Sequence, residues 1–230
     1  MPAEPAQPAD SAQPAQPADS VEHWLVEAQR RGYLGPGPLE SMTEHSLGFA
    51  DVVEEVLGGP PAELLDMGSG GGVPGLVMAA RWSEARVTLV EGSTRRGAFL
   101  VEVTRGLGWA DDGRVQVVIQ RAEELGRDPG WREQAGLVVA RLFGTPPVTA
   151  ECAAPLLRVG GALVVSEPPD PAPGGDSRSR WPADALQPLG LEPAEVVRRR
   201  GFGYQVVRKV APTPERFPRR VGTPAKRPLY

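Results

Sequence analysis

The feature that most constrains this chain is a cluster of glycines directly behind a short, mainly apolar segment. Four of the five residues from 68 to 72 are glycine, and they follow the segment 64–67. Glycine tolerates positive φ and lets a ligand approach the backbone closely. Pro74 then stands where the first turn of a helix would begin, a place that suits a residue without an N–H group. We therefore predict a strand, a ligand-binding loop and a helix in this order.

The spacing of this loop separates several kinds of nucleotide site. No Gly-Lys-Ser/Thr follows, so the loop is not a P-loop. Gly70, Gly72 and Gly75 do satisfy the G-x-G-x-x-G pattern of dinucleotide sites. Asp66 precedes them, however, and a carboxylate there would repel a pyrophosphate but pair with an ammonium group, such as that of S-adenosylmethionine (SAM). A second interpretation, in which Asp66 caps the loop and contacts no ligand, stays open.

A second acidic residue supports the SAM interpretation. The alternating segment 87–91 reads as a strand that ends in Glu91, 19 positions after Gly72. A carboxylate at the tip of the second strand can accept hydrogen bonds from both ribose hydroxyls. The alternative is a tight turn and an unrelated solvated Glu. The two elements in this order favour a nucleoside site.

Composition narrows the class of protein. At 230 residues the chain suits one α/β domain with additions. A single cysteine, Cys152, excludes a disulfide framework, and we expect it in the core. Two histidines, His23 and His45, are too few for a metal site, and we expect packing roles for both. No long apolar run or signal pattern occurs, so we expect a cytoplasmic protein without a membrane partner. We also expect a monomer.

Charge is distributed unevenly along the chain. The formal net charge is −4, yet residues 198–230 hold ten Lys and Arg against one acidic residue, Glu215. A basic end can bind a phosphate backbone even when the overall charge is negative. The alternative is that this segment merely neutralises the acidic remainder.

Four regions follow from composition and periodicity. We expect a disordered Pro/Ala/Gln-rich tail over 1–20, helices within 21–60, a SAM-binding domain over 61–210 and a basic tail over 211–230. Strands are predicted at 63–67, 86–90, 115–119, 136–140 and 162–166, with a hairpin at 194–200 and 204–210. Helices are predicted at 21–31, 43–57, 74–82, 94–107 and 148–157. This is the Rossmann-like α/β architecture of a class I SAM-dependent methyltransferase, a mostly parallel sheet with an antiparallel C-terminal hairpin.

Four stretches carry a resemblance to a known family. They are 65–75, Arg121-Ala122-Glu123-Glu124, Ala140-Arg141, and the ending Arg220-Val221-Gly222-Thr223-Pro224-Ala225-Lys226-Arg227-Pro228-Leu229. Over about residues 40–230 the chain resembles the small-subunit ribosomal RNA methyltransferase G family, also called glucose-inhibited division protein B. The resemblance implies methylation of N7 of a guanosine in 16S rRNA with SAM as cofactor, on free RNA or the small ribosomal subunit.

The resemblance also implies roles for individual residues. Ala122 and Glu123 would flank the adenine, and Arg141 would act as the catalytic residue beside the methionine portion of SAM. The complete implied cofactor set is Asp66, Gly68, Ser69, Gly70, Gly72, Glu91, Ala122, Glu123 and Arg141. The implied RNA-binding set is Arg219, Arg220, Lys226 and Arg227.

The chain departs from the family pattern in several places. The amino-terminal helices are shortened, Leu142 follows Arg141 where the family has Ala, and Ser166-Glu167-Pro168-Pro169 replaces a Lys-Gly pair. A carboxylate at 167 would repel phosphate. Two alternatives therefore stay open. One is a small-molecule methyltransferase with a lid over 168–180, and the other is a SAM- or RNA-binding module without turnover.

Overall fold

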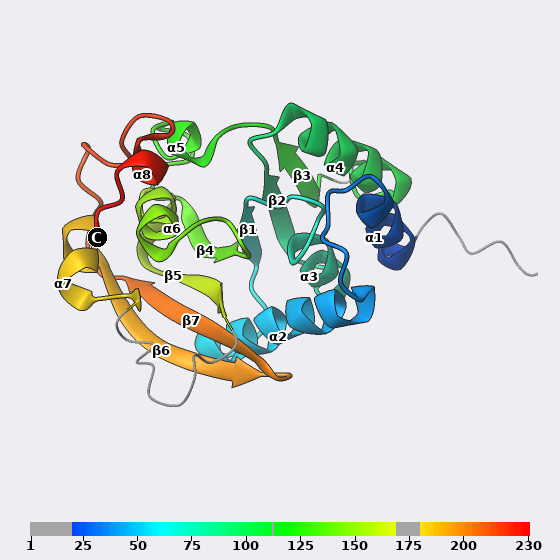
Figure 1. Cartoon of the computed structure of the whole chain (residues 1–230), viewed down its shortest axis with the longest axis horizontal. Helices are drawn as coiled ribbons and strands as arrows, with labels where there is room; N and C mark the ends of the chain where they lie inside the picture. Colours follow the sequence, from blue (N-terminus) through cyan, green and yellow to red (C-terminus); the bar gives the residue numbers. More distant parts are fainter. Residues whose placement is uncertain (1–19, 112, 169–179) are drawn as a thin grey trace, which may run out of the picture.

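A single mixed sheet organises the protein. The computed structural model describes residues 20–111, 113–168 and 180–230, and its seven strands run in the order β3-β2-β1-β4-β5-β7-β6 (Figure 1). Neighbouring strands from β3 to β5 are parallel, whereas β7 is antiparallel to both β5 and β6. The strands are β1 (Glu63–Met67), β2 (Arg86–Val90), β3 (Val115–Val118), β4 (Ala135–Ala140), β5 (Leu157–Glu167), β6 (Leu191–Arg199) and β7 (Phe202–Lys209).

Helices cover both faces of this sheet. Figure 1 shows α1, α3 and α4 on one side and α5, α6 and α8 on the other, with α2 running beneath β1 toward the hairpin. The helices are α1 (Val21–Arg30), α2 (Leu39–Leu57), α3 (Gly75–Arg81), α4 (Thr94–Gly106), α5 (Ala122–Leu125), α6 (Pro146–Ala153), α7 (Ala183–Leu186) and α8 (Thr223–Lys226), with the 3-10 turn η2 (Gln187–Leu189). Among the described helices, none has the length and apolar character that crossing a membrane requires.

Alternate residues of the central strands enter two separate cores. Leu64 packs in one cluster with Phe49, and Leu65 packs in the other with Cys152. All four are at most 4 % exposed. A strand covered on both faces has no polar face, which is why β1 reads as an apolar run. Cys152 is fully buried, as its sequence context predicts.

The amino-terminal helices form where the spacing predicts them. The Ser20 hydroxyl accepts the N–H of His23 and caps α1. Trp24 on α1 faces the core. The second helix begins at Leu39, before the predicted start at 43, because Pro38 precedes it with an extended backbone that ends the incoming loop. Of the predicted tail over 1–20, residues 1–19 lie outside the described residues, as do residues 169–179 of the predicted lid over 168–180.

The prediction around the fifth strand was wrong in its boundaries. The helix predicted over 148–157 ends at Ala153, and residues 158–161, which lie before the strand predicted at 162–166, belong to β5, which begins at Leu157. Gly160 has φ +86°, and pairing with β4 shifts in register between Ala135 and Leu137. The glycines therefore form a bulge within the strand rather than a turn before it.

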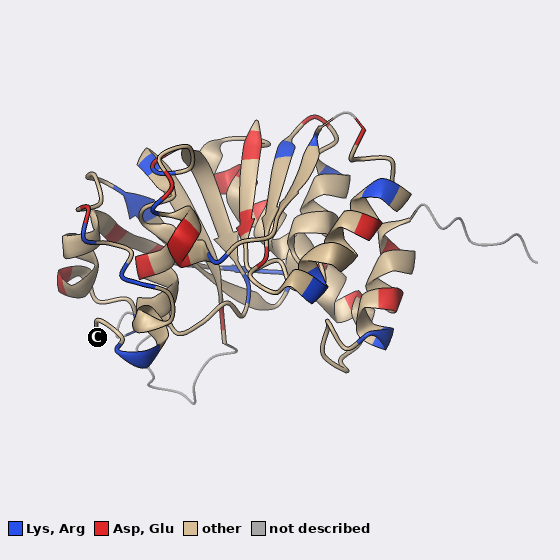
Figure 2. Ribbon diagram, turned by 90° about the horizontal axis from the view of Figure 1, so that it is seen from above, with Lys and Arg blue, Asp and Glu red and all other residues tan. Residues whose placement is uncertain are grey.

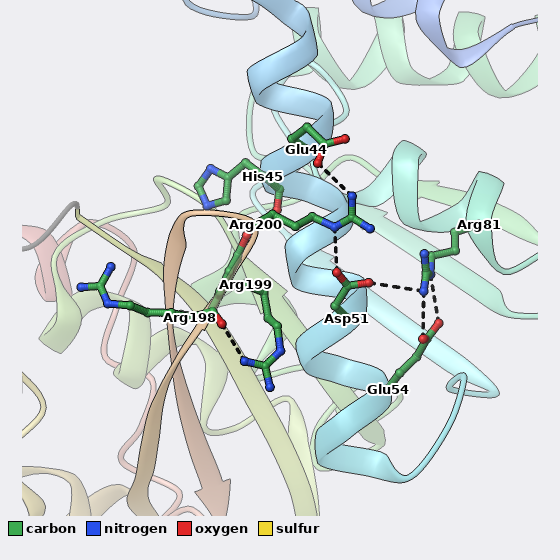
Figure 3. A network of polar contacts seen from close by, with 9 residues as sticks. Glu44, His45, Asp51, Glu54, Arg81, Arg198, Arg199 and Arg200 are labelled. Carbon is green, nitrogen blue, oxygen red and sulfur yellow. Dashed lines mark hydrogen bonds and ion pairs between the residues drawn. The ribbon is translucent and has the colours of Figure 1, made fainter.

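Ion pairs fix α2 between α3 and the β6–β7 hairpin (Figure 3). Arg200, in the tip of the hairpin, donates to Asp51 at 2.7 Å and to Glu44 at 2.8 Å. From α3, Arg81 contacts Asp51 at 3.3 Å and Glu54 at 2.9 Å. Each partly exposed pair contributes little alone, but the shared carboxylate of Asp51 joins three elements.

A closer contact between α2 and β7 depends on a missing side chain. The Tyr204 hydroxyl donates to the carbonyl of His45 at 2.7 Å, and Tyr204 is fully buried. A Cβ placed on Gly48 would lie 2.1 Å from that hydroxyl oxygen. Position 48 therefore admits glycine because the phenol ring occupies the space of a side chain.

We expect Gly48→Ala to lower the free energy of unfolding by about 1–3 kcal/mol, since the added methyl overpacks a rigid contact. In an unobstructed helix the same change would stabilise by about 1 kcal/mol. Urea unfolding followed by circular dichroism measures the difference. The control is Gly35→Ala, where a Cβ meets nothing within 4 Å. A stabilised Gly48→Ala protein would contradict the contact.

Candidate active site

A pocket of about 320 Å³ opens at the carboxyl ends of β1, β2 and β4. This edge of a parallel sheet is where α/β proteins bind their ligands. The wall is formed by the segments that follow these strands and β3, together with the loop between α1 and α2. Its lining residues are Tyr33, Leu34, Gly35, Gly68, Ser69, Gly70, Gly71, Val73, Val90, Glu91, Gly92, Arg96, Gln120, Arg121, Ala122, Arg141, Leu142 and Phe143.

The turn after β1 forms the floor of this pocket. The N–H groups of Gly68 and Ser69 donate to the carbonyl of Val90 at 2.8 and 3.0 Å, which holds the turn against the end of β2. Gly68 has φ +82°, and a Cβ there would lie 2.6 Å from the ring of Phe143. The absence of side chains leaves backbone exposed on the pocket floor, as the glycine cluster predicts.

Glu91 is the residue that fixes the shape of the turn. Its side chain is 3 % exposed, and one carboxylate oxygen accepts the N–H of Gly70 at 2.9 Å. The other oxygen accepts the Ser93 N–H and an Arg96 N–H, both at 2.7 Å. Glu91 lines the pocket, and its role toward a ribose stays a prediction. It also accepts two backbone N–H groups, which the sequence did not indicate.

Asp66 lies beneath the turn and is not part of the pocket wall. It is fully buried, and one carboxylate oxygen accepts the Gly75 N–H at the start of α3 at 3.1 Å. Within the described part of the chain, the other oxygen has no hydrogen-bond partner. Burial raises the pKa of Asp66 from 3.8 to about 7, against the opposing effect of its hydrogen bonds. This is the capping geometry that the sequence left open.

Ala122 and Glu123, which the resemblance places beside the adenine, lie in two different environments. Ala122 lines the pocket. The neighbouring carboxylate of Glu123 instead accepts an Arg121 N–H and the Gly222 N–H, both at 3.0 Å. Glu123 therefore holds the C-terminal segment against α5, while Ala122 faces the space beside it.

Arg141 enters the pocket from the end of β4 and contacts α2. Its Nε donates to Nδ1 of His45 at 3.3 Å. Burial lowers the pKa of His45 to about 4, with the nearby Arg141 charge adding to the effect, so the imidazole is neutral and can accept this bond. The His45 ring also stacks on Phe202 at 4.5 Å between centroids. Figure 3 shows His45 on α2 beside the hairpin.

The residue after Arg141 is held differently from its neighbours. Leu142 has φ +54° and a side chain that is 81 % exposed, whereas Phe143 packs against Gly68 inside the pocket. A left-handed backbone at a non-glycine residue costs on the order of 1 kcal/mol or more. The chain thus leaves Leu142 exposed at the mouth of the pocket.

Comparison with known proteins decides the family. The family model described as rRNA small subunit methyltransferase G matches residues 25–167. A curated relative of that name from Roseiflexus castenholzii is 39 % identical over 200 residues, which covers 83 % of this chain and 80 % of the relative. Another from Chloroflexus aggregans is 38 % identical over 174 residues, covering 74 % and 70 %. The chain belongs to the rRNA small subunit methyltransferase G family.

Solved structures agree on the fold of this methyltransferase G family member. A putative O-methyltransferase from Klebsiella pneumoniae aligns with a TM-score of 0.56 at 15 % identity, covering 86 % of this chain and 92 % of that one. The 1,6-didemethyltoxoflavin-N1-methyltransferase of Burkholderia thailandensis aligns with a TM-score of 0.54 at 19 % identity, covering 88 % and 94 %. The predicted class I fold and SAM-dependent methyltransferase class are therefore confirmed.

The four basic residues that the resemblance implies for RNA binding lie in two different environments. Arg219 is held by Glu151, a fully buried carboxylate that accepts its backbone N–H at 2.8 Å and its guanidinium at 2.5 Å. Arg220, Lys226 and Arg227 are exposed, and no ion pair involves them in the described part of the chain. Figure 2 shows blue segments on the ribbon near the C-terminal end.

Sequence reasoning missed the loop between α1 and α2. Leu34 lies so close to the glycine turn that a Cβ on Gly71 would be 2.7 Å from its Cγ. Tyr33 lines the pocket and accepts a hydrogen bond from Arg95 Nε at 3.0 Å. The available signal was two large apolar side chains inside a Gly/Pro-rich loop, which is unusual for a solvated connection.

The raised pKa of Asp66 predicts a specific dependence of stability on pH. Between about pH 4 and 7 the folded protein binds a proton at Asp66 that the unfolded chain has released, so this group lowers stability as pH rises. We expect Asp66→Asn, which keeps an acceptor for Gly75, to gain stability relative to wild type over this range. Urea unfolding at several pH values measures the difference. A difference that does not change with pH would contradict the buried, proton-binding carboxylate.

Proposed function

We propose that this enzyme transfers the methyl group of SAM to N7 of a guanosine in 16S rRNA. Membership of the rRNA small subunit methyltransferase G family supports ribosomal RNA as the substrate. The residues around the pocket bear on which atom of the nucleotide is methylated and on whether the acceptor is RNA.

The pocket residues fit the cofactor. The bare backbone of Gly68 and Gly70 would accommodate the nucleoside without a side chain in the way, and Glu91 would face its ribose. Ala122 would lie at the adenine, and Arg141 at the opposite wall. When bound, SAM supplies a methyl group activated on a sulfonium sulfur.

The observation that carries the proposal is the lack of a free general base. The residues that line the described pocket include no His, Cys or Lys, and its carboxylate, Glu91, already accepts three hydrogen bonds. Guanine N7 has an available lone pair and loses no proton on methylation. Positioning of the base is then sufficient, and proximity alone can lower the barrier substantially. An oxygen acceptor would instead need a base to remove its proton.

Two features favour RNA over a small molecule. Arg220, Lys226 and Arg227 are exposed on the segment that Glu123 holds beside the pocket. Glu167, the residue expected to repel phosphate, accepts the indole N–H of Trp181 at 2.8 Å and pairs with Arg180. Its charge is therefore balanced within the protein.

We also propose that the enzyme acts as a monomer in the cytoplasm. A ribosomal RNA substrate would place the reaction where ribosomes are assembled.

We expect purified protein and methyl-labelled SAM to place label in 16S rRNA of small subunits that lack the modification. Nuclease digestion and chromatography should then recover 7-methylguanosine. Small subunits from a modified strain are the control, since their site is already occupied. Label at another atom would refute the N7 assignment, and the absence of label in any RNA would refute the function.

We expect the triple variant Arg220→Gln, Lys226→Gln, Arg227→Gln to bind rRNA more weakly and with a shallower salt dependence. Each lost phosphate contact reduces the slope of log K against log salt by about 0.7 to 0.9. Filter binding at several salt concentrations measures the slope. The control is Arg86→Gln, an exposed cation at the amino end of β2, which should leave the slope unchanged. An unaltered slope in the triple variant would exclude the tail from the RNA interface.

A further inference from the structure

Leu142 is an exposed apolar residue that has no role in the proposed reaction as described so far. Its side chain is 81 % exposed, whereas the other large hydrophobic residues that are exposed in the described chain range from 37 % to 52 %. It sits between Arg141 and Phe143, and all three line the pocket. The most exposed apolar side chain thus stands at the mouth of the site.

The backbone around Leu142 shows that this exposure is imposed by its neighbours. Arg141 is fixed from α2 by His45, and Phe143 is fixed by its contact with Gly68. The residue between these two anchors has φ +54°, a conformation that Gly or Asn adopts more readily than Leu. The site therefore presents an apolar side chain where a polar or absent one would be favoured in the free protein.

The chemistry around the mouth indicates what would cover this side chain. Arg141 lines the same pocket, and Arg220 and Lys226 lie exposed on the neighbouring tail, whereas Arg96 and Arg121 line the pocket as partners of Glu91 and Glu123. Cations on the same side of the protein as an apolar projection match an RNA strand, which has charged phosphates and apolar base faces. An apolar protein surface would not match the cations.

The reaction itself creates a place for an apolar side chain. A base must leave its stack to enter a pocket, which exposes the face of the adjoining base. Leucine side chains are among those that proteins insert between unstacked bases. We propose that Leu142 packs against the RNA base next to the methylated guanosine and fills the space that the guanine vacates. This assignment rests on the proposed function and makes Leu142 a determinant of substrate binding.

Steady-state kinetics on unmodified small subunits tests the proposal with three substitutions. Leu142→Asn suits the left-handed backbone but removes the apolar contact, and Leu142→Ala shortens it. We expect both to raise KM for the subunit by about tenfold, since the lost burial of one apolar side chain is worth at least 1.4 kcal/mol. Leu142→Met keeps an apolar side chain of similar volume and should stay within about twofold of wild type. The affinity for SAM, measured by calorimetry, should be unchanged in all three.

Controls separate this role from the alternatives. Val159→Ala truncates an apolar side chain that is 50 % exposed. Val159 lies near the amino end of β5, away from the carboxyl ends of the strands at the pocket, so this change should leave KM unaltered. Equal KM values for the Asn, Met and wild-type proteins would overturn the proposal, as would a loss that follows SAM affinity. Dissociation of a wild-type dimer by Leu142→Asn in sedimentation would assign the side chain to contact between copies instead. A wild-type enzyme without rRNA methylation would refute the proposed function, not this contact alone.

Discussion

The hydrogen bond from the Gly70 N–H to the Glu91 carboxylate is the interaction on which the pocket depends. It joins the turn after β1 to the end of β2, and the same carboxylate organises the start of α4 through Ser93. A buried acceptor with a full charge forms stronger hydrogen bonds than a neutral one. The carboxylate thus performs two tasks, since it shapes the turn and lies in the wall that a nucleoside would contact. The same carboxylate therefore shapes the pocket and joins β1 to β2.

The sequence predicted this part of the structure well because its signals are local. Glycine clustering and the acidic end of the next strand each depend on a few adjacent residues, and so do the alternating strands of the hairpin. The contacts of Leu34 with Gly71 and of Phe143 with Gly68 have no such local signal. They join segments far apart in the chain, and no periodicity records which loop will meet which turn. The sequence therefore indicated the floor of the pocket and the wall residues Glu91 and Arg141, but not the walls formed by Leu34 and Phe143.

The sequence also could not predict which way its charged side chains point. The sequence predicts Asp66, Glu123 and Arg219 as ligand contacts, yet each makes its principal contact inside the protein. A carboxylate that leaves solvent needs donors, and the nearest backbone N–H groups supply them. Residue type indicates that a charge is needed near a site. Which of its neighbours the charge will face is decided by burial, and burial is a property of the assembled fold.

The contact of Gly48 with Tyr204 extends further than the helix and strand that it joins. The Tyr204 ring packs against the bare backbone of Gly48 and its hydroxyl donates to the carbonyl of His45, so rotation of α2 about its axis or translation along β7 would break this contact. The contact therefore restricts the orientation of the His45 imidazole. The guanidinium of Arg141 is positioned by its hydrogen bond to that ring. A hydrogen atom in place of a methyl group at Gly48, one helical turn from His45, thereby constrains the position of the arginine in the pocket wall.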